Sequence, residues 1–247
     1  MNGYGRGLFG MTPVVKNIIF INIIMLLAYY AAGRVFNVDL IQILGMHFPK
    51  SEAFKPIQII THMFMHAGFM HLFFNMFALY MFGQILENVW GPKRFIIYYF
   101  VTGLGAMILH ESVIAIQYHK VMGMISSSQL QDIIDNGYTY FLEHKVYVDP
   151  VKRELQTILF TPTVGASGAV FGVLLAFGVL FPNTQLMLLF PPIPIKAKYF
   201  VMIYGGIELY LAVTQPGSSI AHAAHIGGML FGYILIRIWR KTSNTLY

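Results

Sequence analysis

The sequence predicts an all-α polytopic membrane protein, in which six transmembrane helices form one bundle and one domain over residues 1–247. Composition is the first reason: 57% of the 247 residues are hydrophobic and only 11% are charged, whereas soluble domains carry about 25% charged residues. Periodicity is the second reason. The apolar residues form long continuous runs rather than short alternating ones, which favours helices over the strands of a membrane barrel.

Six apolar runs are long enough to be considered as spans, although several are near or below the ~20 residues that a straight span needs. We therefore expect their ends to extend further or to stop inside the protein. The first run could pass for a secretory signal peptide, but the five later runs favour a membrane span. The predicted spans are residues 17–32, 68–86, 95–116, 164–181, 199–213 and 220–239.

The connecting segments differ in character. Residues 37–60 mix apolar and charged side chains, which indicates a segment lying at the membrane interface. Residues 117–162 form a long outer loop that holds five of the ten acidic residues. Within this loop residues 129–147 fit a short helix, without clean periodicity. Residues 182–198 are rich in proline and cannot form one uninterrupted helix.

The charge distribution predicts the orientation. If the N-terminus is cytoplasmic, the inner segments carry nine basic residues and one acidic residue, while the outer segments carry seven and eight. Short cytoplasmic loops are enriched in Lys and Arg, so both termini are predicted to be cytoplasmic. The net charge of +6 is scattered between the apolar runs. A nucleic-acid binder needs its charge on one exposed face, so nucleic acid is not a predicted partner.

Metal and cofactor chemistry has little support. The chain has no cysteine, which excludes disulfides, a cysteine nucleophile and thiolate metal sites. His62 and His66 are spaced i, i+4 and could ligate a metal ion, but no HExxH motif accompanies them. We predict no metal and no cofactor.

Polar residues inside membrane spans are costly and are therefore candidates for function. Three groups stand out: Gly165–Ala169 around Ser167, Ala221–Gly228 with two histidines, and a group with His66, His71 and Asn75. Each lies within about two turns of the outer end of its span, and a helix rises 1.5 Å per residue. The three groups should therefore share one layer near the outer surface.

These groups can perform nucleophilic chemistry. Ser167 sits at a helix N-terminus between glycines, and a serine hydroxyl needs a base within hydrogen-bond reach to act as a nucleophile. The histidines of the sixth span, His222 and His225, can each supply that base. His71 and Asn75 lie on one helix face and can donate hydrogen bonds to an oxyanion.

No acidic residue lies in the same helical stretch as Ser167 or these histidines, which predicts a serine–histidine dyad without a carboxylate. Glu208, in the fifth span, either lines the bundle interior or extends toward the outer surface. Gly168 with Gly172, and Gly228 with Gly232, have the small-xxx-small spacing that lets helix backbones approach. Such contacts can bring Ser167 to its base.

The ordered set of motifs resembles the rhomboid proteases over nearly all of the chain. Gly165-Ala166-Ser167-Gly168 lies on the fourth span, Ala224–Gly228 reads Ala-His-x-x-Gly on the sixth, and His71 with Asn75 forms HxxxN on the second. The outer loop 117–162 is longer than in the minimal family core. The tryptophan-arginine pair often seen in the family's first outer loop is absent from residues 37–60.

The resemblance implies an intramembrane serine endopeptidase that cuts in or near the transmembrane segments of other proteins. It implies Ser167 as nucleophile, His225 rather than His222 as base, His71 and Asn75 at the oxyanion, and Phe171 packed against the catalytic imidazole. Implied partners are single-span membrane proteins, which would enter from the lipid bilayer between the second and fifth spans. The compact form implies a bacterial inner membrane.

Two other functions compete with this interpretation. An inactive rhomboid relative that binds clients should lack the serine or the histidine, and both are present. A small transporter could use the histidines and Glu208 as a proton path, but no internal repeat or symmetry is visible in the sequence.

Overall fold

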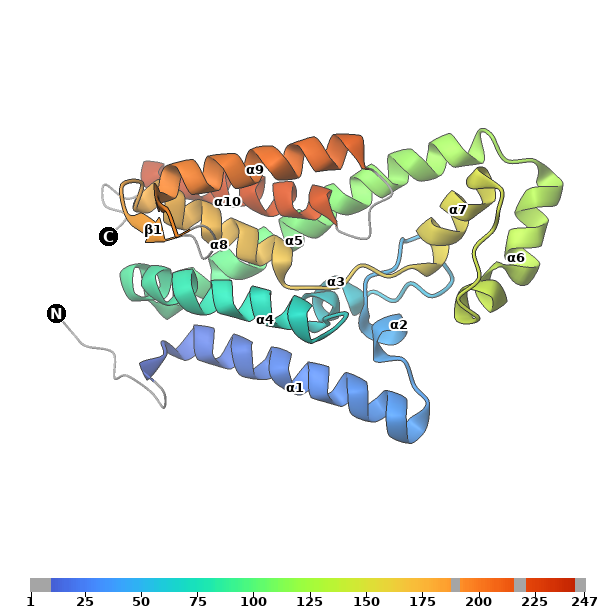
Figure 1. Cartoon of the computed structure of the whole chain (residues 1–247), viewed down its shortest axis with the longest axis horizontal. Coiled ribbons are helices and arrows are strands. Elements are labelled where there is room, and N and C mark those ends of the chain that lie inside the picture. Colours follow the sequence, from blue (N-terminus) through green and yellow to red (C-terminus); the bar gives the residue numbers. More distant parts are fainter. Residues whose placement is uncertain (1–9, 188–191, 216–220, 243–247) are drawn as a thin grey trace.

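The structure, a computed structural model, describes residues 10–187, 192–215 and 221–242. Arg6, one of the nine basic residues counted on the cytoplasmic side, and Ile220, the first residue of the sixth predicted span, lie outside these residues. Long helices form an elongated bundle, and shorter helices gather at one end of it (Figure 1). The bundle helices are α1 (Pro13–Phe36), α4 (Phe69–Ala78) continued by η3 (Leu79–Gly83), α5 (Gln84–Met122), α8 (Ser167–Leu180), α9 (Ala197–Thr214) and α10 (His222–Thr242).

The helix α5 contains a break that separates two predicted spans. Gly91 has φ 77° and ψ 163° inside an otherwise helical stretch, a backbone conformation that only glycine adopts at low cost. Pro92 follows it at a position that restarts the helix. The chain therefore reverses direction at Gly91, and the second and third predicted spans run antiparallel.

Among the described residues, two helical stretches are long and apolar enough to cross a membrane: Pro13–Phe36 and Phe69–Met122. The second stretch contains two of the six predicted spans. Helix α8 is apolar but has 14 residues, about 21 Å of helix against a hydrocarbon core of about 30 Å. The described chain thus has a helix at each predicted span, while the count of six membrane crossings stays a prediction.

A buried carboxylate joins the N-terminal end of α1 to the first turn of α5. Thr12 at the N-cap of α1 makes no side-chain capping bond. Glu87 takes over this role, because its two oxygens accept hydrogen bonds from Val14 N and Val15 N, each at 2.9 Å. Such bonds satisfy amides that the first helical turn leaves free.

The segment before α4 is organised by one glutamine. Helices α2 (Leu40–Leu44), α3 (Gln58–Thr61) and η2 (His62–Phe64) lie here. Gln58 is fully buried. It accepts from the amides of His47 and Lys55 and donates to the carbonyls of Ile43 and Ala53. This network folds the segment into compact loops.

The long outer loop contains two helices, α6 (Ser127–Leu142) and α7 (Pro150–Phe160). The prediction of one short helix within 129–147 identified α6 in part and missed α7. The two helices lie beside the outer end of α5 (Figure 1). Their apolar cluster is separate from the cluster of the bundle; its buried members are Phe48, Val121, Ile133, Tyr147, Leu155 and Ile158. We refer to α6 and α7 as the outer cap.

The proline-rich segment is not a continuous helix, as predicted. Strands β1 (Gln185–Met187) and β2 (Pro194–Lys196) pair antiparallel at the end of the bundle opposite the outer cap (Figure 1). This hairpin is a small addition to an otherwise helical fold.

Candidate active site

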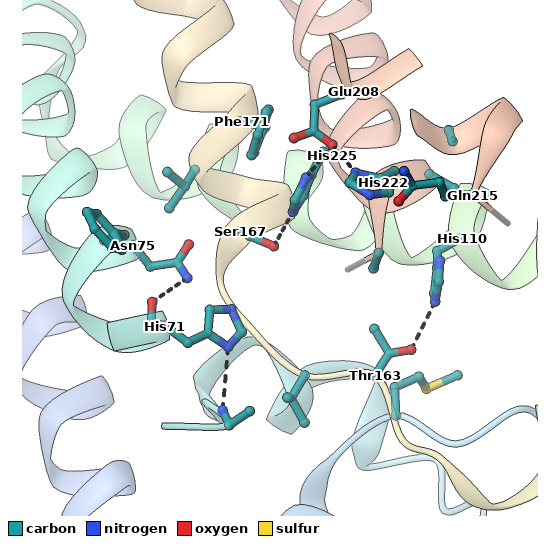
Figure 2. A pocket seen from close by; sticks show the side chains of 18 of the residues that line it. His71, Asn75, His110, Thr163, Ser167, Phe171, Glu208, Gln215, His222 and His225 are labelled. Atoms are coloured by element: carbon teal, nitrogen blue, oxygen red, sulfur yellow. Dashed lines mark hydrogen bonds and ion pairs between the residues drawn. The ribbon is translucent and has the colours of Figure 1, made fainter. Parts of the chain in front are cut away.

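Ser167 and His225 meet in the structure, although 58 residues separate them in the chain. Ser167 is the first residue of α8, and its Oγ lies 2.9 Å from Nε2 of His225 on α10 (Figure 2). This distance is that of a hydrogen bond. The predicted convergence of the fourth and sixth spans is therefore confirmed in the geometry.

Aromatic packing holds the His225 ring in place. Phe171, one turn after Ser167, stacks on the imidazole with centroids 4.0 Å apart and an interplanar angle of 8°. Tyr204 of α9 stacks on the other side of Phe171, with centroids 5.0 Å apart. The predicted contact between Phe171 and the imidazole is confirmed, and both ring nitrogens remain available at the ring edge.

Glycines bring α8 and α10 close enough for this contact. A Cβ atom added at Gly228 would collide with the backbone carbonyl of Gly168. The next glycines of the two predicted pairs face α5 instead: a Cβ at Gly172 would collide with Thr102, and one at Gly232 with Tyr98. Gly168 and Gly228 thus make the predicted contact between α8 and α10. Gly172 and Gly232 let these two helices pack closely on α5.

Four hydrogen bonds hold the backbone segment before Ser167 in place. Met46 and Thr163 exchange two backbone hydrogen bonds of 2.9 and 2.8 Å, and Gly165 N donates to the carbonyl of His62 at 2.9 Å. His110 Nε2 bonds the hydroxyl of Thr163 at 2.9 Å. Gly165 has φ +128°, which favours glycine. Sequence reasoning missed Thr163 and His110, because neither belongs to a motif.

His71 and Asn75 lie on α4, facing the backbone around Ser167 (Figure 2). His71 Nδ1 accepts from Ala67 N at 3.4 Å, so its proton sits on Nε2. A Cβ at Gly165 would lie 2.9 Å from that Nε2. Asn75 Nδ2 donates one hydrogen to the His71 carbonyl at 2.9 Å, and its second hydrogen remains available.

His66, which the sequence analysis grouped with His71 and Asn75, is buried behind His71. It is 1% exposed, and its ring packs edge-on against His71 with centroids 4.9 Å apart. Burial, and next the charge of His71, lower the pKa of His66 to about 3. His62, which the sequence analysis considered with His66 as a metal ligand, instead uses Nδ1 in a 2.9 Å hydrogen bond with the Gln58 carbonyl.

Glu208 lies beside both histidines, a neighbour that the prediction of a dyad without an acid did not consider. Its Oε2 lies 2.9 Å from Nδ1 of His225 and 2.6 Å from Nδ1 of His222 (Figure 2). Glu208 is 5% exposed, so of its two predicted placements the bundle interior is the observed one. The prediction considered only acids near Ser167 and the histidines in sequence, whereas this acid comes from another helix, α9.

The described residues hold one group of side chains whose geometry also invites a metal ion. One ligand atom each from Glu208, His222 and His225 lie within 4.8 Å of one another. Two ligands of a tetrahedral zinc ion, with bonds of about 2.0–2.1 Å, stand about 3.3 Å apart. The observed separations of 2.6 and 2.9 Å are shorter and fit hydrogen bonds better.

A cavity of about 1890 Å³ connects these groups. Ser167, His225, His71, Asn75 and Glu208 all line it, as the prediction of one shared polar layer requires. Side chains of α4, η3 and α9 line it along the bundle, and side chains of α7 line its outer end; examples are Phe74, Met81, Phe200, Tyr204, Arg153 and Thr157.

Comparison with known proteins identifies the sequence pattern. A family model described as "Rhomboid domain" matches residues 53–242. The chain is 30% identical to RHOMBOID-like protein 12, mitochondrial, of Arabidopsis thaliana over 69% of its length. It is 28% identical to the putative rhomboid protease YdcA of Bacillus subtilis over 72%, and 26% identical to rhomboid protease AarA of Providencia stuartii over 70%.

The matches cover only part of these relatives: 42% of the Arabidopsis protein, 64% of YdcA and 52% of AarA. The chain thus spans about half the length of the curated relatives that it matches.

Proposed function

The chain belongs to the rhomboid family, and from this premise we propose that it is an intramembrane serine endopeptidase. Members of this family are integral membrane proteins, and two of the relatives are named as rhomboid proteases. The proposed reaction is hydrolysis of peptide bonds in or near the transmembrane segments of membrane proteins.

One observation carries the proposal: the 2.9 Å contact between Ser167 Oγ and His225 Nε2, at the edge of a large cavity. A serine in a membrane helix usually serves packing. Packing alone does not account for an imidazole aimed at the hydroxyl, and a nucleophile paired with a base has this geometry.

The chemistry follows from the positions of the atoms. Ser167 Oγ bonds to the scissile carbonyl carbon as His225 Nε2 takes the hydroxyl proton, and the carbonyl electron pair moves onto oxygen. His225 then protonates the amine as the C–N bond breaks, leaving an acyl-enzyme. A water molecule attacks this ester, gives its proton to His225, and the proton returns to Ser167 when the acid product leaves.

Donors from α4 face the oxyanion that forms in each step. His71 Nε2–H and the second Nδ2 hydrogen of Asn75 are free in the resting geometry. Such preorganised donors lower the barrier because they need no rearrangement as charge develops. We assign His71 and Asn75 to this role.

The proposed substrates are single-span membrane proteins. A substrate segment would enter between α4 and α9, whose side chains line the cavity on the way to Ser167. The polar outer end of the cavity would admit the water that hydrolysis consumes. From the six apolar runs and the compact form we propose six crossings of a bacterial inner membrane. The distribution of the basic residues favours cytoplasmic termini.

A serine-directed probe tests the proposal. Purified protein in detergent is treated with a fluorophosphonate, and labelled residues are located by mass spectrometry. We expect label on Ser167 in the wild type and none in Ser167→Ala. Equal labelling of the two proteins would contradict the assignment of the nucleophile.

The same assay, together with cleavage of a membrane-protein substrate, distinguishes the roles of His222 and His225. His225→Ala removes the base, so we expect labelling and cleavage to fall by at least about 10³-fold. His222→Ala leaves the base in place and should retain measurable turnover. The reverse order would mean that His222 is the base.

The oxyanion assignment predicts a specific kinetic change. Asn75→Ala removes a donor that acts mainly on the transition state, so kcat should fall by about 10²–10³-fold while KM changes little. Steady-state cleavage at several substrate concentrations separates the two constants. A change confined to KM would remove Asn75 from the oxyanion site.

A further inference from the structure

We propose that Glu208 is the third member of a Ser167–His225–Glu208 triad, a positioning residue that acts through the His225 ring. The proposal rests on the proposed protease function and extends it to α9, a helix that carries neither the nucleophile nor the base. A serine–histidine pair is sufficient for the function proposed above, so the role of Glu208 is a separate question with its own test.

The hydrogen bonds of His225 determine where its proton lies. To accept the Ser167 hydroxyl proton, Nε2 must be unprotonated, so the neutral ring carries its hydrogen on Nδ1. Glu208 Oε2 stands 2.9 Å from that Nδ1 and has no hydrogen to donate when ionised. The carboxylate therefore selects the reactive tautomer and holds the ring edge toward Ser167.

The same carboxylate opposes the charge that forms during the reaction. When His225 takes the proton from Ser167 it becomes an imidazolium, and Glu208 is a hydrogen-bonded anion beside it. Both side chains are buried, Glu208 at 5% exposure and His225 at 8%, so solvent screens this attraction little. Glu208 neither gains nor loses a proton in any step.

His222 has a distinct place in this arrangement. Its Nδ1 donates to the same Oε2 of Glu208 at 2.6 Å. A buried carboxylate is costly unless donors satisfy it, and His222 supplies a donor that the reaction does not consume. The two histidines of α10 are thus one turn apart with different tasks: His225 is the base, and His222 anchors the carboxylate.

Glu208 also attaches α9 to the bundle, which gives a competing structural explanation. The buried residues of α9 are Ala197, Val201 and Glu208. The first two lie in its opening turns, so the contact of Glu208 with α10 holds the outer half of the helix. A purely structural Glu208 would act as a latch on the proposed entrance between α4 and α9.

A small probe separates the two explanations, because it reaches Ser167 without needing the entrance to open for a helix. We expect Glu208→Gln to slow fluorophosphonate labelling of Ser167 by about 10²–10⁴-fold, as loss of the acid does in other serine triads. Glu208→Asp restores the charge and should label at least about tenfold faster than Glu208→Gln. In substrate cleavage, kcat should fall with little change in KM.

Glu87→Gln is the matched control, since it makes the same change at a carboxylate that is 2% exposed and caps α1 at the far end of the bundle. It should label at the wild-type rate. Labelling of Glu208→Gln within about threefold of the wild type, with an altered KM, would establish a latch and overturn the triad.

A measurement on the wild type tests the proposal even if Glu208→Gln does not fold. In protein labelled with ¹⁵N-histidine, the His225 ring should carry its proton on Nδ1, with a downfield proton signal that disappears in Glu208→Gln. A proton on Nε2 in the resting wild type would overturn the proposal. Faster fluorophosphonate labelling of the wild type on addition of a chelator would also overturn it, because Glu208 and the histidines would then bind a metal.

The two proposals fail in different ways. If wild-type Ser167 is not labelled and no substrate is cut, the protease function fails and the triad fails with it. If the wild type reacts while Glu208→Gln reacts equally well, the serine–histidine pair stands and only the role of Glu208 is lost.

Discussion

The bundle around α8 and the outer cap each enclose a buried apolar cluster, but different contacts join their helices. In the bundle, α8 and α10 touch through backbone at Gly168 and Gly228. In the cap, α6 and α7 pack through large side chains such as Ile133 and Leu155, both fully buried. Membrane helices gain little from burying apolar side chains against each other, so they depend on close backbone packing.

Helix ends differ between the two regions as well. The cap follows the capping rules of water-soluble helices: Ser126 and Gln129 form a capping box on α6, and Asp149 accepts from Lys152 N at the start of α7. Helix α8 begins without a side-chain cap. Its free amides lie where the oxyanion is proposed to form, so the absence of a cap leaves donors for a ligand.

This contrast predicts different responses to the same small substitution. Gly228→Ala places a methyl group against the Gly168 carbonyl, and a backbone atom cannot move aside alone. We expect α10 to shift away from α8 and the labelling of Ser167 to fall by at least about 10²-fold, since a shift of about 1 Å at a reacting pair costs that much. The fluorophosphonate labelling rate measures it.

Two glycine controls make the comparison sharp. Gly137→Ala on α6 meets the ring of Phe160 at 2.9 Å, and a side chain can rotate away, so labelling should be unaffected. Gly206→Ala on α9 meets nothing within 4 Å. If Gly228→Ala labels as fast as these two variants, the close α8–α10 contact is not what positions the pair.

Much of the bundle could be predicted because hydropathy marks long apolar helices regardless of their partners. Motif order then placed Ser167 and His225 on facing helices. The break at Gly91 falls in the gap between the predicted spans 68–86 and 95–116, so the sequence located it as well. Gln58 was missed because a buried glutamine has no sequence signature; its burial depends on carbonyls and amides elsewhere in the loop.

Glu208 was detectable in principle. It lies six residues before the outer end of α9, at the depth where His222 and His225 begin α10. An ionisable residue within an apolar span is a functional candidate, and a comparison of depths between spans would have joined it to the histidines. The second cap helix likewise had a signal, because Asp149-Pro150 is an N-cap followed by proline at the first helical position.

The next prediction concerns the cap core. Leu155→Ala removes a fully buried side chain of α7 and should cost about 2–5 kcal/mol locally, from lost transfer energy and the cavity left behind. Leu155 does not line the active-site cavity. We therefore expect faster hydrogen exchange in α6 and α7, unchanged exchange in α8 and α10, and labelling of Ser167 near the wild-type rate. Equal acceleration in both regions would show that cap and bundle unfold together.

The smallest expected effect is electrostatic and belongs to the cap alone. Lys152 of α7 donates to Asp132 of α6 at 2.7 Å. This hydrogen bond, and next that from Asn136, lower the pKa of Asp132 below its ordinary value. A lowered folded-state pKa means that the carboxylate stabilises the fold above the pKa of the unfolded chain, and that this stabilisation is lost as the pH falls through the folded value.

Asp132→Asn should therefore lower Tm slightly at neutral pH and have almost no effect near pH 3 or below, where the wild-type carboxyl is itself becoming protonated. The effect is small because the pair is partly exposed to solvent, at 21% and 32%, where ion pairs contribute little. Glu143→Gln, which breaks the more exposed pair with Lys145, is the control and should change Tm less. Thermal unfolding at the two pH values decides the matter. If Asp132→Asn differs from the wild type by the same Tm at both pH values, side-chain packing rather than charge joins α6 to α7.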